Sequence, residues 1–489
     1  MATHYLASWV NTLKYSDLPQ DVIEAAVRSF YNWAGCAIGG SNHPATTIAV
    51  RHAFTLKSGQ LLIDDQYDAL KPFFGAPAAS LLGQRGKISI DAQHAALLNG
   101  IASHVHDYDD THLDTIIHPT GPVASALLAV AEWKGGFSGR EFLLALTAGI
   151  EAECKVGLAV WPEHYDVGWH ITSTTGSIGA AVAVSKLLSL SITQTAHAIG
   201  IAATQVVGLR EMFGSHTKSF HPGRAAQNGL MAAVLAQGGY TSSEQTLEAK
   251  RGWANVVGVT KESLDKSLEK WLGFEPTSQA LGLGLPTPKQ PGRWEILRNS
   301  FKPFPCGIVI HPIIDGCAQL HQDMATQSLG SKDVKSVELS VHPLVLELTG
   351  KRTPKDGLEG KFSCYHGAAI GLIYGKGTPS QYEDAVVQDS HVIAVRDKVN
   401  ATADKSLGAD EAKIILTMND GTVLKKHVLH AVGSTEVPLT NKMLEEKFKD
   451  QCASVLGDRL NDVSASLRNI EQATDMRELT KRVLRIHEA

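Results

Sequence analysis

Three stretches of small apolar residues, each preceded by a short polar motif containing histidine, constrain the fold of this chain more than any other feature. Ala, Gly and Ser are abundant in these stretches, which are 123–131, 171–185 and 225–236. Small side chains let helix backbones approach closely, so the segments predict helices that pack into a compact helical core. The start of a helix leaves about four backbone N–H groups unpaired and carries the positive end of the helix dipole. The three junctions therefore predict a pocket for a small polycarboxylate or phosphorylated acid.

Apolar residues recur with helical spacing through residues 1–275, which we predict to form the first part of a large all-helical domain. Pro19 is placed at a helix start, and Ser138 begins a capping box ahead of another helix. Residues 436–489 are helical again, with Thr440 as the N-cap of their first helix. The predicted fold class is mainly α.

A smaller α+β domain is predicted to interrupt the helical one. Prolines and glycines mark residues 276–292 as a linker, and no strand is predicted before residue 290. Residues 337–341 alternate like a half-buried strand, and two apolar runs flank a hairpin turn at 419–421. We therefore predict an α+β domain at residues 293–435, inserted into the helical domain.

Composition argues against several classes of protein. The net charge of −5 and the pI near 6.5 show no basic excess, which argues against nucleic acid as a partner. The six cysteines form no CxxC pair, so neither a zinc ribbon nor a four-cysteine cluster is predicted, and the thiols are expected to be free. Residues 1–21 lack the features of a secretory signal or a transit peptide, so the expected location is cytoplasmic. Residues 187–209 carry no formal charge but many polar side chains, which favours a buried helix pair over a membrane span.

The first polar motif, residues 104–112, combines three histidines with three aspartates, and His118 follows after a short loop. Such residues could ligate a metal ion, but no known metal-binding spacing fits them, so we predict no metal. Asp107 and Thr111 are four residues apart, and a helical segment would place both on one face. The plainer alternative for the last two aspartates is a solvated acidic turn that caps the next helix.

The second and third motifs add further candidates. His170 precedes the second small-residue stretch, where a histidine by itself is more often a satisfied core residue than a catalyst. The third motif contains Lys218, His221 and Arg224, and its plainer alternative is a solvated basic turn. Lys218 is expected at a polar junction outside the helix that follows.

Two candidates come from the start of the α+β domain. Lys302 and His311 lie before and after a proline-containing turn. They either line a cleft between the domains or merely shape this turn.

Five motifs in order resemble the MmgE/PrpD family, and the similarity spans nearly the whole chain. They are His-x-x-Asp-Tyr-Asp-Asp-Thr at 104–111 followed by His-Pro at 118–119, Gly-Trp-His at 168–170, Thr-Lys-Ser-Phe-His-Pro-Gly-Arg-Ala-Ala at 217–226, Phe-Lys-Pro-Phe-Pro-Cys at 301–306 and Gly-Leu-Glu-Gly-Lys-Phe-Ser at 357–363. The family includes 2-methylcitrate dehydratase, cis-aconitate decarboxylase and iminodisuccinate epimerase. The resemblance implies a large helical domain, a smaller α+β lid domain, a homodimer and catalysis without a cofactor.

Carried over by position, the resemblance to the decarboxylases implies five pocket residues. These are Asp107, Thr111, His118, His170 and Lys218. The chain departs from the decarboxylases in two places. Leu346 aligns with the lid tyrosine of the animal enzymes, and one extra residue separates Thr111 from His118. Both departures count against decarboxylation.

The reactions of this family make or quench a carbanion beside a carboxylate, which requires a positioned base and cations that stabilise the developing charge. We expect Lys218 and His170 to supply cations and to lower each other's pKa, and His118 or His170 to carry the proton. Asp107 would orient a histidine, and Thr111 would hydrogen-bond a substrate carboxylate. The further candidates for substrate binding are His221, Arg224, Lys302 and His311.

We therefore predict a hydro-lyase that acts on a citrate-like tricarboxylic acid, such as 2-methylcitrate or a longer 2-alkylcitrate. Decarboxylation of cis-aconitate and epimerisation of an amino-dicarboxylate are the alternatives within the family. A catalytically silent helical scaffold is the alternative outside it, but a scaffold would have no chemical need for the polar pocket positions.

Overall fold

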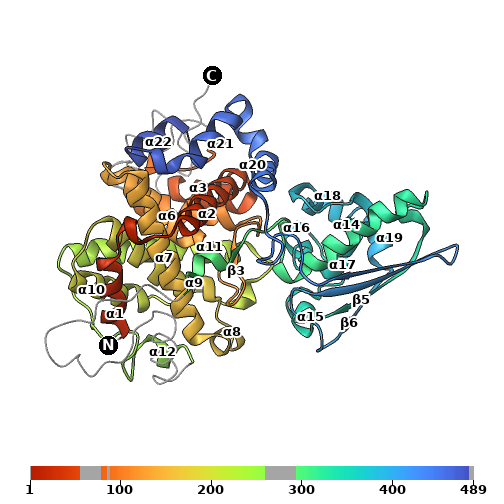
Figure 1. Cartoon of the computed structure of the whole chain (residues 1–489), viewed down its shortest axis with the longest axis horizontal. Coiled ribbons are helices and arrows are strands. Elements are labelled where there is room, and N and C mark those ends of the chain that lie inside the picture. Colours follow the sequence, from red (N-terminus) through yellow and green to blue (C-terminus); the bar gives the residue numbers. More distant parts are fainter. Residues whose placement is uncertain (1, 56–78, 85–88, 259–292, 484–489) are drawn as a thin grey trace.

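The computed structural model describes residues 2–55, 79–84, 89–258 and 293–483, which form two bodies of unequal size. The larger body consists of helices from both ends of the chain, and the smaller body, at the right of Figure 1, combines helices with a sheet. Each body has its own hydrophobic core. The described residues are mainly α-helical, which confirms the predicted fold class.

Most helices of the larger body come from residues 2–256. They are α1 (Ala2–Thr12), α2 (Gln20–Gly39), α3 (Pro44–Thr55), α5 (Ala92–His104), α6 (Thr120–Lys134), α7 (Gly139–Val160), α8 (Glu163–Asp166), α9 (Ile171–Leu187), α10 (Ile192–Ala203), α11 (His216–Gln237) and α12 (Trp253–Val256). The end of the chain adds α20 (Asn441–Leu456), α21 (Leu460–Arg468) and α22 (Met476–Val483).

The ends of these helices follow the predicted signals. Pro19 is the N-cap residue of α2, and Gly40 ends that helix. Ser138 and Glu141 form the expected capping box of α7, and the Thr440 hydroxyl caps α20 by accepting from a backbone N–H. Local sequence therefore sets these boundaries.

Helices α9 and α11 pack against each other at the centre of the larger body, with α5, α6, α7 and α10 around them. Glycine permits the closest approaches. A Cβ atom on Gly100 of α5 would lie 2.5 Å from the Cα atom of Gly223 in α11, and one on Gly149 of α7 would lie 2.8 Å from the Gly179 carbonyl oxygen in α9. The small-residue stretches thus form the close-packed helical core that the sequence predicts.

The smaller body is built on a four-stranded sheet with the order β6-β5-β7-β8. Its strands are β5 (Val334–Val341), β6 (Val399–Ala403), β7 (Ala412–Met418) and β8 (Val423–Val428). Strand β5 is parallel to β6 and antiparallel to β7, and β7 and β8 form the predicted hairpin, with Gly421 at a φ of 91°. Its helices are α14 (His311–Thr326), α15 (Pro343–Thr349), α16 (Gly357–Gly360), α17 (Cys364–Tyr374), α18 (Asp384–Val387) and α19 (Ser390–Arg396).

The chain crosses between the two bodies near residues 300 and 433. Strand β4 (Asn299–Ser300) pairs with β3 (Thr111–His112), which joins the first polar motif to the outgoing crossing. The Ser300 hydroxyl donates to the Gly433 carbonyl, so the outgoing and returning segments lie side by side. Lys302 follows directly and is thereby held close to the first motif.

The predictions of strands and of domain boundaries need comment. Strands do occur before residue 290, namely β1 (Ala79–Ser80), β2 (Ser89–Ile90) and β3, but each is two residues long and too short for a pattern of alternation. The predicted linker 276–292 lies outside the described residues, and the boundaries at 292/293 and 435/436 stay predictions.

The six cysteines are free and buried, as expected. None of the helices in the described part of the chain combines the length and apolar character that a membrane span needs.

Candidate active site

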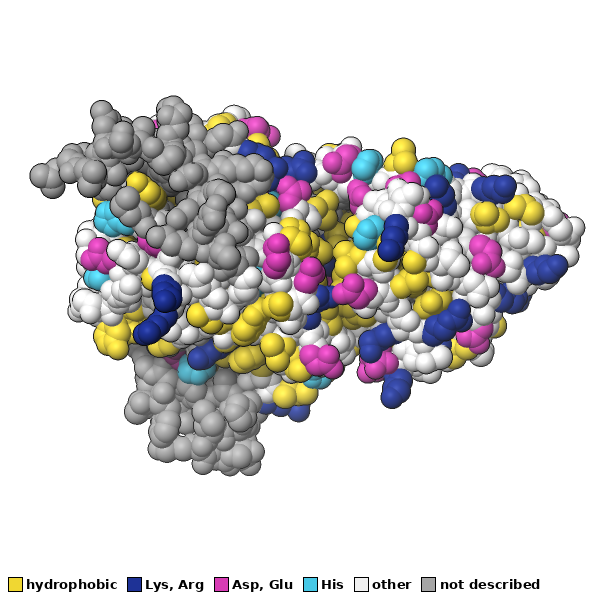
Figure 2. Space-filling view, turned by 90° about the horizontal axis from the view of Figure 1, so that it is seen from below, with side chains coloured by type: hydrophobic (Ala, Val, Ile, Leu, Met, Phe, Trp, Pro, Cys, Tyr) yellow, Lys and Arg dark blue, Asp and Glu magenta, His cyan; other side chains and the backbone are white. Residues whose placement is uncertain are grey.

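A pocket lies where the two bodies meet, and both contribute to its lining. Its charged and histidine side chains are five of the predicted site residues: Asp107, His118, His170, Lys218 and Lys302. The rest of the lining is mainly apolar and includes Ile116, Phe213, Ile308, Val309, Leu348 and Phe362. On the outer face drawn in Figure 2, hydrophobic side chains also gather at the boundary between the bodies, with charges of both signs interspersed around them.

Local backbone geometry positions the pocket side chains of the larger body. His118 lies just before α6, His170 is the N-cap residue of α9, and Lys218 is the third residue of α11. Asp107 follows α5 in a left-handed conformation with a φ of 51°, which is uncommon outside glycine. Such a strained conformation persists only where surrounding contacts stabilise it, and here hydrogen bonds from two lysines hold the Asp107 side chain.

Asp107 Oδ1 accepts hydrogen bonds from two buried ammonium groups, Lys218 Nζ at 2.7 Å and Lys302 Nζ at 2.9 Å. Burial alone would raise the pKa of Asp107, but these cations outweigh it and hold that pKa well below its usual value. Burial also lowers the pKa of Lys218, against the attraction of Asp107. The cluster therefore presents fixed charges in a low-dielectric site, where they can act strongly on a developing negative charge.

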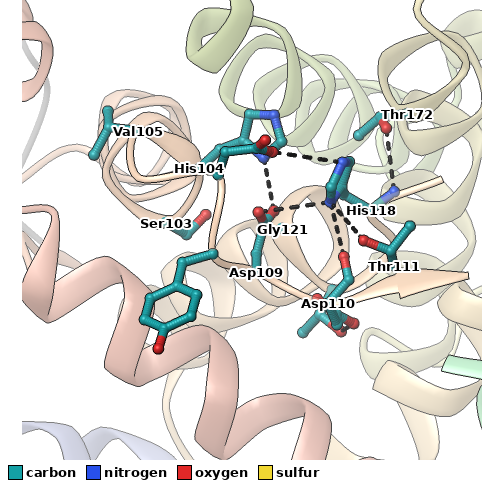
Figure 3. Close-up of polar contacts among 12 residues, drawn as sticks. Ser103, His104, Val105, Asp109, Asp110, Thr111, His118, Gly121 and Thr172 are labelled. Atoms are coloured by element: carbon teal, nitrogen blue, oxygen red, sulfur yellow. Dashed lines mark hydrogen bonds and ion pairs between the residues drawn. The ribbon is translucent and has the colours of Figure 1, made fainter. Parts of the chain in front are cut away.

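His104 joins this cluster to Asp109 (Figure 3). Its Nδ1 lies 2.7 Å from Asp109 Oδ2, and because a carboxylate only accepts, Nδ1 carries the proton. His104 Nε2 then accepts from Lys218 Nζ at 3.0 Å. Asp109 and Asp110 are both fully buried, and Asp110 accepts from the Thr120 hydroxyl. The solvated acidic turn considered for these two aspartates is therefore wrong, because polar partners compensate their burial.

His118 is held in one tautomer. Its Nδ1 lies 2.8 Å from the Asp110 carbonyl oxygen, so Nδ1 donates and Nε2 keeps its lone pair. The backbone N–H of His118 donates to the Thr172 hydroxyl at 3.1 Å, which fixes the residue against α9 (Figure 3). Burial lowers the pKa of His118 well below the usual value, despite the attraction of Asp109. At neutral pH the ring is a neutral base whose Nε2 lies 3.9 Å from Asp107 Oδ1.

His170 is paired with His221 rather than standing alone. Their Nδ1 atoms lie 2.8 Å apart, so one donates and the other accepts. Burial, aided by His221 and Lys218, lowers the pKa of His170 well below its usual value, and burial lowers that of His221 to about 4. Lys218 thus helps to lower the pKa of His170, as expected, whereas burial, aided by Lys302, lowers the pKa of Lys218. The expectation that His170 is a cation is wrong, because burial keeps it neutral.

The residues of the first motif offer atoms that could ligate a metal ion. Ligand-type atoms of His104, Asp107, Asp109 and His118 lie within 4.8 Å of one another. The two ammonium groups of Lys218 and Lys302 already contact the Asp107 carboxylate, and His104 Nε2 accepts from one of them. A divalent ion would meet both ammonium charges and displace these bonds, so the donor set fits the lysines better than a metal.

Four predicted site residues lie outside the pocket lining. Thr111 lies in β3, not in a helix. Its hydroxyl is 3.3 Å from His118 Nδ1, so it contacts the ring of His118 instead of lining the pocket. His221 lies behind His170, as described. Arg224 donates to Gln227 on its own helix at 2.6 Å. His311 is buried edge-to-face against Phe304, and its Nε2 has no hydrogen-bond partner among the described residues.

The third junction differs from expectation, and Leu346 lies outside the pocket lining. Helix α11 begins at His216, so Lys218 lies inside the helix and is 7% exposed, rather than outside it at a polar junction. The small-residue stretch at 225–236 is only the second part of α11, whose first turns contain the polar motif and Pro222. Leu346 packs against the core of the smaller body, and Leu348, two residues further along α15, lines the pocket instead.

Sequence reasoning did not select two residues that the structure places here. His104 connects Lys218 to Asp109, and Lys361 is buried beside the cluster with a pKa that burial lowers to about 7. Both belong to motifs that carry the family resemblance, at 104–111 and 357–363, and this was the signal that could have found them.

Comparison with known proteins gives matches over almost the whole chain. Sequence profiles of the MmgE/PrpD N-terminal domain and of the MmgE/PrpD C-terminal domain match residues 4–263 and 304–470. The cis-aconitate decarboxylase-like protein oryM of Aspergillus oryzae is 26% identical over 495 residues, which cover 98% of this chain and 96% of that protein. Cis-aconitate decarboxylase of Homo sapiens is 25% identical over 491 residues, with 98% and 93% covered. The mitochondrial 2-methylcitrate dehydratase of Yarrowia lipolytica is 26% identical over 332 residues, with 63% and 59% covered.

Proposed function

Because the chain belongs to the MmgE/PrpD family, we propose that this lyase dehydrates a citrate-like tricarboxylic acid, such as 2-methylcitrate or a longer 2-alkylcitrate, without a metal ion. The observation that carries the proposal is the pairing of a free base, His118 Nε2, with a separate proton donor, the Lys218 ammonium, in one pocket. Dehydration needs both groups, since one removes a proton from carbon and the other protonates the departing hydroxyl.

In this mechanism His118 Nε2 takes the proton from the carbon beside a substrate carboxylate. The electron pair of that C–H bond forms the double bond, the C–O bond breaks, and the hydroxyl leaves as water with a proton from Lys218. The ammonium of Lys302 stabilises the negative charge that spreads onto the carboxylate. After the reaction His118 carries the proton and Lys218 lacks one. Asp107 Oδ1 lies between them, 3.9 Å from His118 Nε2 and 2.7 Å from Lys218 Nζ, and offers a path for the proton from His118 to Lys218.

The apolar part of the pocket supports an alkyl-bearing substrate. Ile116, Ile308, Val309 and Leu348 line the same pocket as the cationic cluster. A methyl or longer alkyl group would remove this apolar surface from water, a gain of roughly 25 cal/mol per Å² buried that plain citrate cannot provide.

Decarboxylation of cis-aconitate is the second candidate. The relatives that match nearly the whole chain carry that activity in their names, whereas the match to the Yarrowia lipolytica dehydratase covers 63% of the chain. The same lysines could stabilise the carbanion left by loss of carbon dioxide, which then needs a single proton donor.

Product masses distinguish the candidates. Purified protein is incubated separately with 2-methylcitrate, citrate and cis-aconitate, and the products are followed by mass spectrometry. The proposal predicts loss of water from 2-methylcitrate, faster than from citrate. Loss of carbon dioxide from cis-aconitate, with both citrates unchanged, would establish the second candidate, and no change in any acid would favour the scaffold.

A further inference from the structure

A second cavity adjoins the candidate active site, and the side chains of Asp107, Lys218 and Phe362 line both. The remaining lining of the second cavity includes His43, Lys361 and the start of α11 at Ser215 and His216. Among the described lining residues, Asp107 is the one carboxylate. The cavity is therefore surrounded by nitrogen-bearing side chains and by the positive end of a helix.

Lys361 is buried here without an acidic partner. It is 4% exposed, and its ammonium donates to the Val105 carbonyl oxygen at 3.2 Å, with no carboxylate within ion-pair distance among the described residues. A buried ammonium that lacks a countercharge is costly, and proteins normally pair such a group or let it lose its proton. Lys361 lies at the wall of a cavity, so an anion that enters the cavity can supply the missing partner.

The nearby carboxylates are already engaged. Asp107 Oδ1 accepts from Lys218 and Lys302, and Asp109 accepts from His104. When Lys361 is protonated, the described side chains that line the two cavities include three ammonium groups, Lys218, Lys302 and Lys361, against one carboxylate, Asp107. The lining is therefore positive, and Lys361 is on the side of the second cavity.

The first turn of α11 adds donors on the same side. The helix runs for 22 residues from His216, and its N-cap residue, Ser215, makes no side-chain capping bond. The first backbone N–H groups of a helix have no intrahelical acceptor, and together with the dipole they favour an anion at this end. Lys361 and the start of α11 thus face one cavity from the two different bodies.

We propose that the second cavity binds a carboxylate of the substrate that does not take part in the chemistry, through Lys361 and the start of α11. In the first cavity Lys302 would hold the reacting carboxylate and Lys218 would face the hydroxyl group, and Lys361 would hold the remote carboxylate. This proposal rests on the proposed function in requiring a substrate with several carboxylates, but it makes no claim about which bond is broken. It assigns Lys361 as a determinant of specificity for tricarboxylic over dicarboxylic acids.

The test measures binding instead of turnover, using acids that lack the hydroxyl group and cannot be dehydrated. Isothermal titration compares tricarballylate, with three carboxylates, and glutarate, with two, on the wild-type protein, Lys361→Met, Lys361→Arg and the control Lys425→Met. Lys425 is an exposed lysine on β8, far along the chain from the cavity residues. The neutral methionine keeps the length of the buried lysine stem, and the arginine keeps its charge.

We expect Lys361→Met to weaken tricarballylate binding by roughly tenfold or more, the loss of one charge-assisted contact, and glutarate binding by less than about twofold. Lys361→Arg should retain a clear preference for tricarballylate, and Lys425→Met should bind both acids like the wild type. Equal weakening of both acids by Lys361→Met, or no weakening, would overturn the proposal. If Lys361→Met does not fold, as judged by thermal unfolding, the neutral variant Lys361→Gln replaces it and is judged by the same criterion.

Inorganic phosphate separates the substrate's own carboxylate from an independent small anion. Phosphate that competes with tricarballylate in the wild type, and does so more weakly in Lys361→Met, supports a shared subsite. Phosphate that binds through Lys361 while tricarballylate stays bound would contradict it. If no acid is dehydrated but the preference for tricarballylate still depends on Lys361, the proposed reaction fails and the subsite stands.

Discussion

At the scale of single residues, sequence motifs identified most residues of the site but not the hydrogen bonds between them. Asp107, His118, His170 and Lys218 were selected from their motifs, and all four line one pocket. The His104–Asp109 pair could not be foreseen, because it depends on the left-handed turn at Asp107, which brings residues of one short motif into contact. Neutral His170 was also missed, since its charge depends on burial that only the packed structure reveals.

The first prediction concerns His118 as the base. His118→Gln removes the ring nitrogen that accepts the proton but keeps a polar side chain, so kcat should fall by on the order of a hundredfold or more while KM changes little. Steady-state kinetics on the substrate found by mass spectrometry measures both. A large rise in KM with unchanged kcat would instead make His118 a binding residue.

The second prediction concerns pH and Lys361. Its pKa is lowered, chiefly by burial, to about 7, so the ammonium is present below that pH and is lost as pH rises through it. An entering anion favours the charged form, so binding of tricarballylate takes up a proton and should weaken as pH rises above about 7. Lys361→Met should lack this part of the pH dependence.

Other titratable groups face the same cavity and set the background: His43, His104, Asp107, His216 and Lys218. Binding of tricarballylate is measured by titration at several pH values between 6 and 9 on the wild-type protein and on Lys361→Met. The difference between their pH profiles gives the contribution of Lys361. Parallel profiles would exclude Lys361 from the binding of the anion.

At the scale of helices and strands, capping signals and periodicity predicted most boundaries, and the main error was to place the start of the third helix after its polar motif. Ser138, Thr440 and the hairpin at 419–421 behaved as expected. Helix α11 starts six residues before Pro222, because tertiary packing against α5 and α9 outweighs the local preference of proline for a helix start.

The third prediction tests the close packing of α11. Gly223→Ala would place a Cβ atom 2.3 Å from the Leu97 carbonyl oxygen of α5, so the helices must separate. Overpacking of this kind typically costs about 1–3 kcal/mol, which should lower the melting temperature by several degrees and disturb Lys218 on the same helix.

Gly238→Ala is the matched control, because Gly238 ends the same helix, has an ordinary negative φ and has only backbone oxygens at 3.4 Å or more near the added carbon. Thermal unfolding of both variants compares them. A Gly223→Ala protein as stable as Gly238→Ala would contradict the packing account.

At the scale of the whole molecule, composition and periodicity predicted a mainly α chain with a strand-containing segment in its second half, and the described residues agree. They could not decide whether Lys302 lines the cleft or only shapes a turn, and they did not select Lys361 of the adjoining cavity. Lys302 and Lys361 come from segments more than 80 residues beyond Lys218, and the pairing of β3 with β4 brings the nearer one into place. Long-range contacts of this kind leave no local pattern in sequence.

The fourth prediction concerns assembly. We propose that the protein forms a homodimer, as the family resemblance implies, and that the larger body provides the contact while the smaller body moves over the substrate. Light scattering at micromolar concentration should give twice the mass of 52.4 kDa. A fully active monomer under the same conditions would refute the dimer.

The turnover of Lys218→Met on the substrate tests the central claim most directly, namely that the buried lysine–aspartate–histidine cluster performs the chemistry. The account predicts a loss of turnover on the order of a hundredfold or more per folded molecule, the usual scale for removing a charge-stabilising or acid–base group, while Lys425→Met stays at the wild-type rate. Lys218 is buried and bonded to Asp107 and His104, so the melting temperature of the Lys218→Met protein should change more than that of the Lys425→Met protein. The folded fraction of each variant is therefore measured first. Unchanged turnover per folded Lys218→Met molecule would contradict the account.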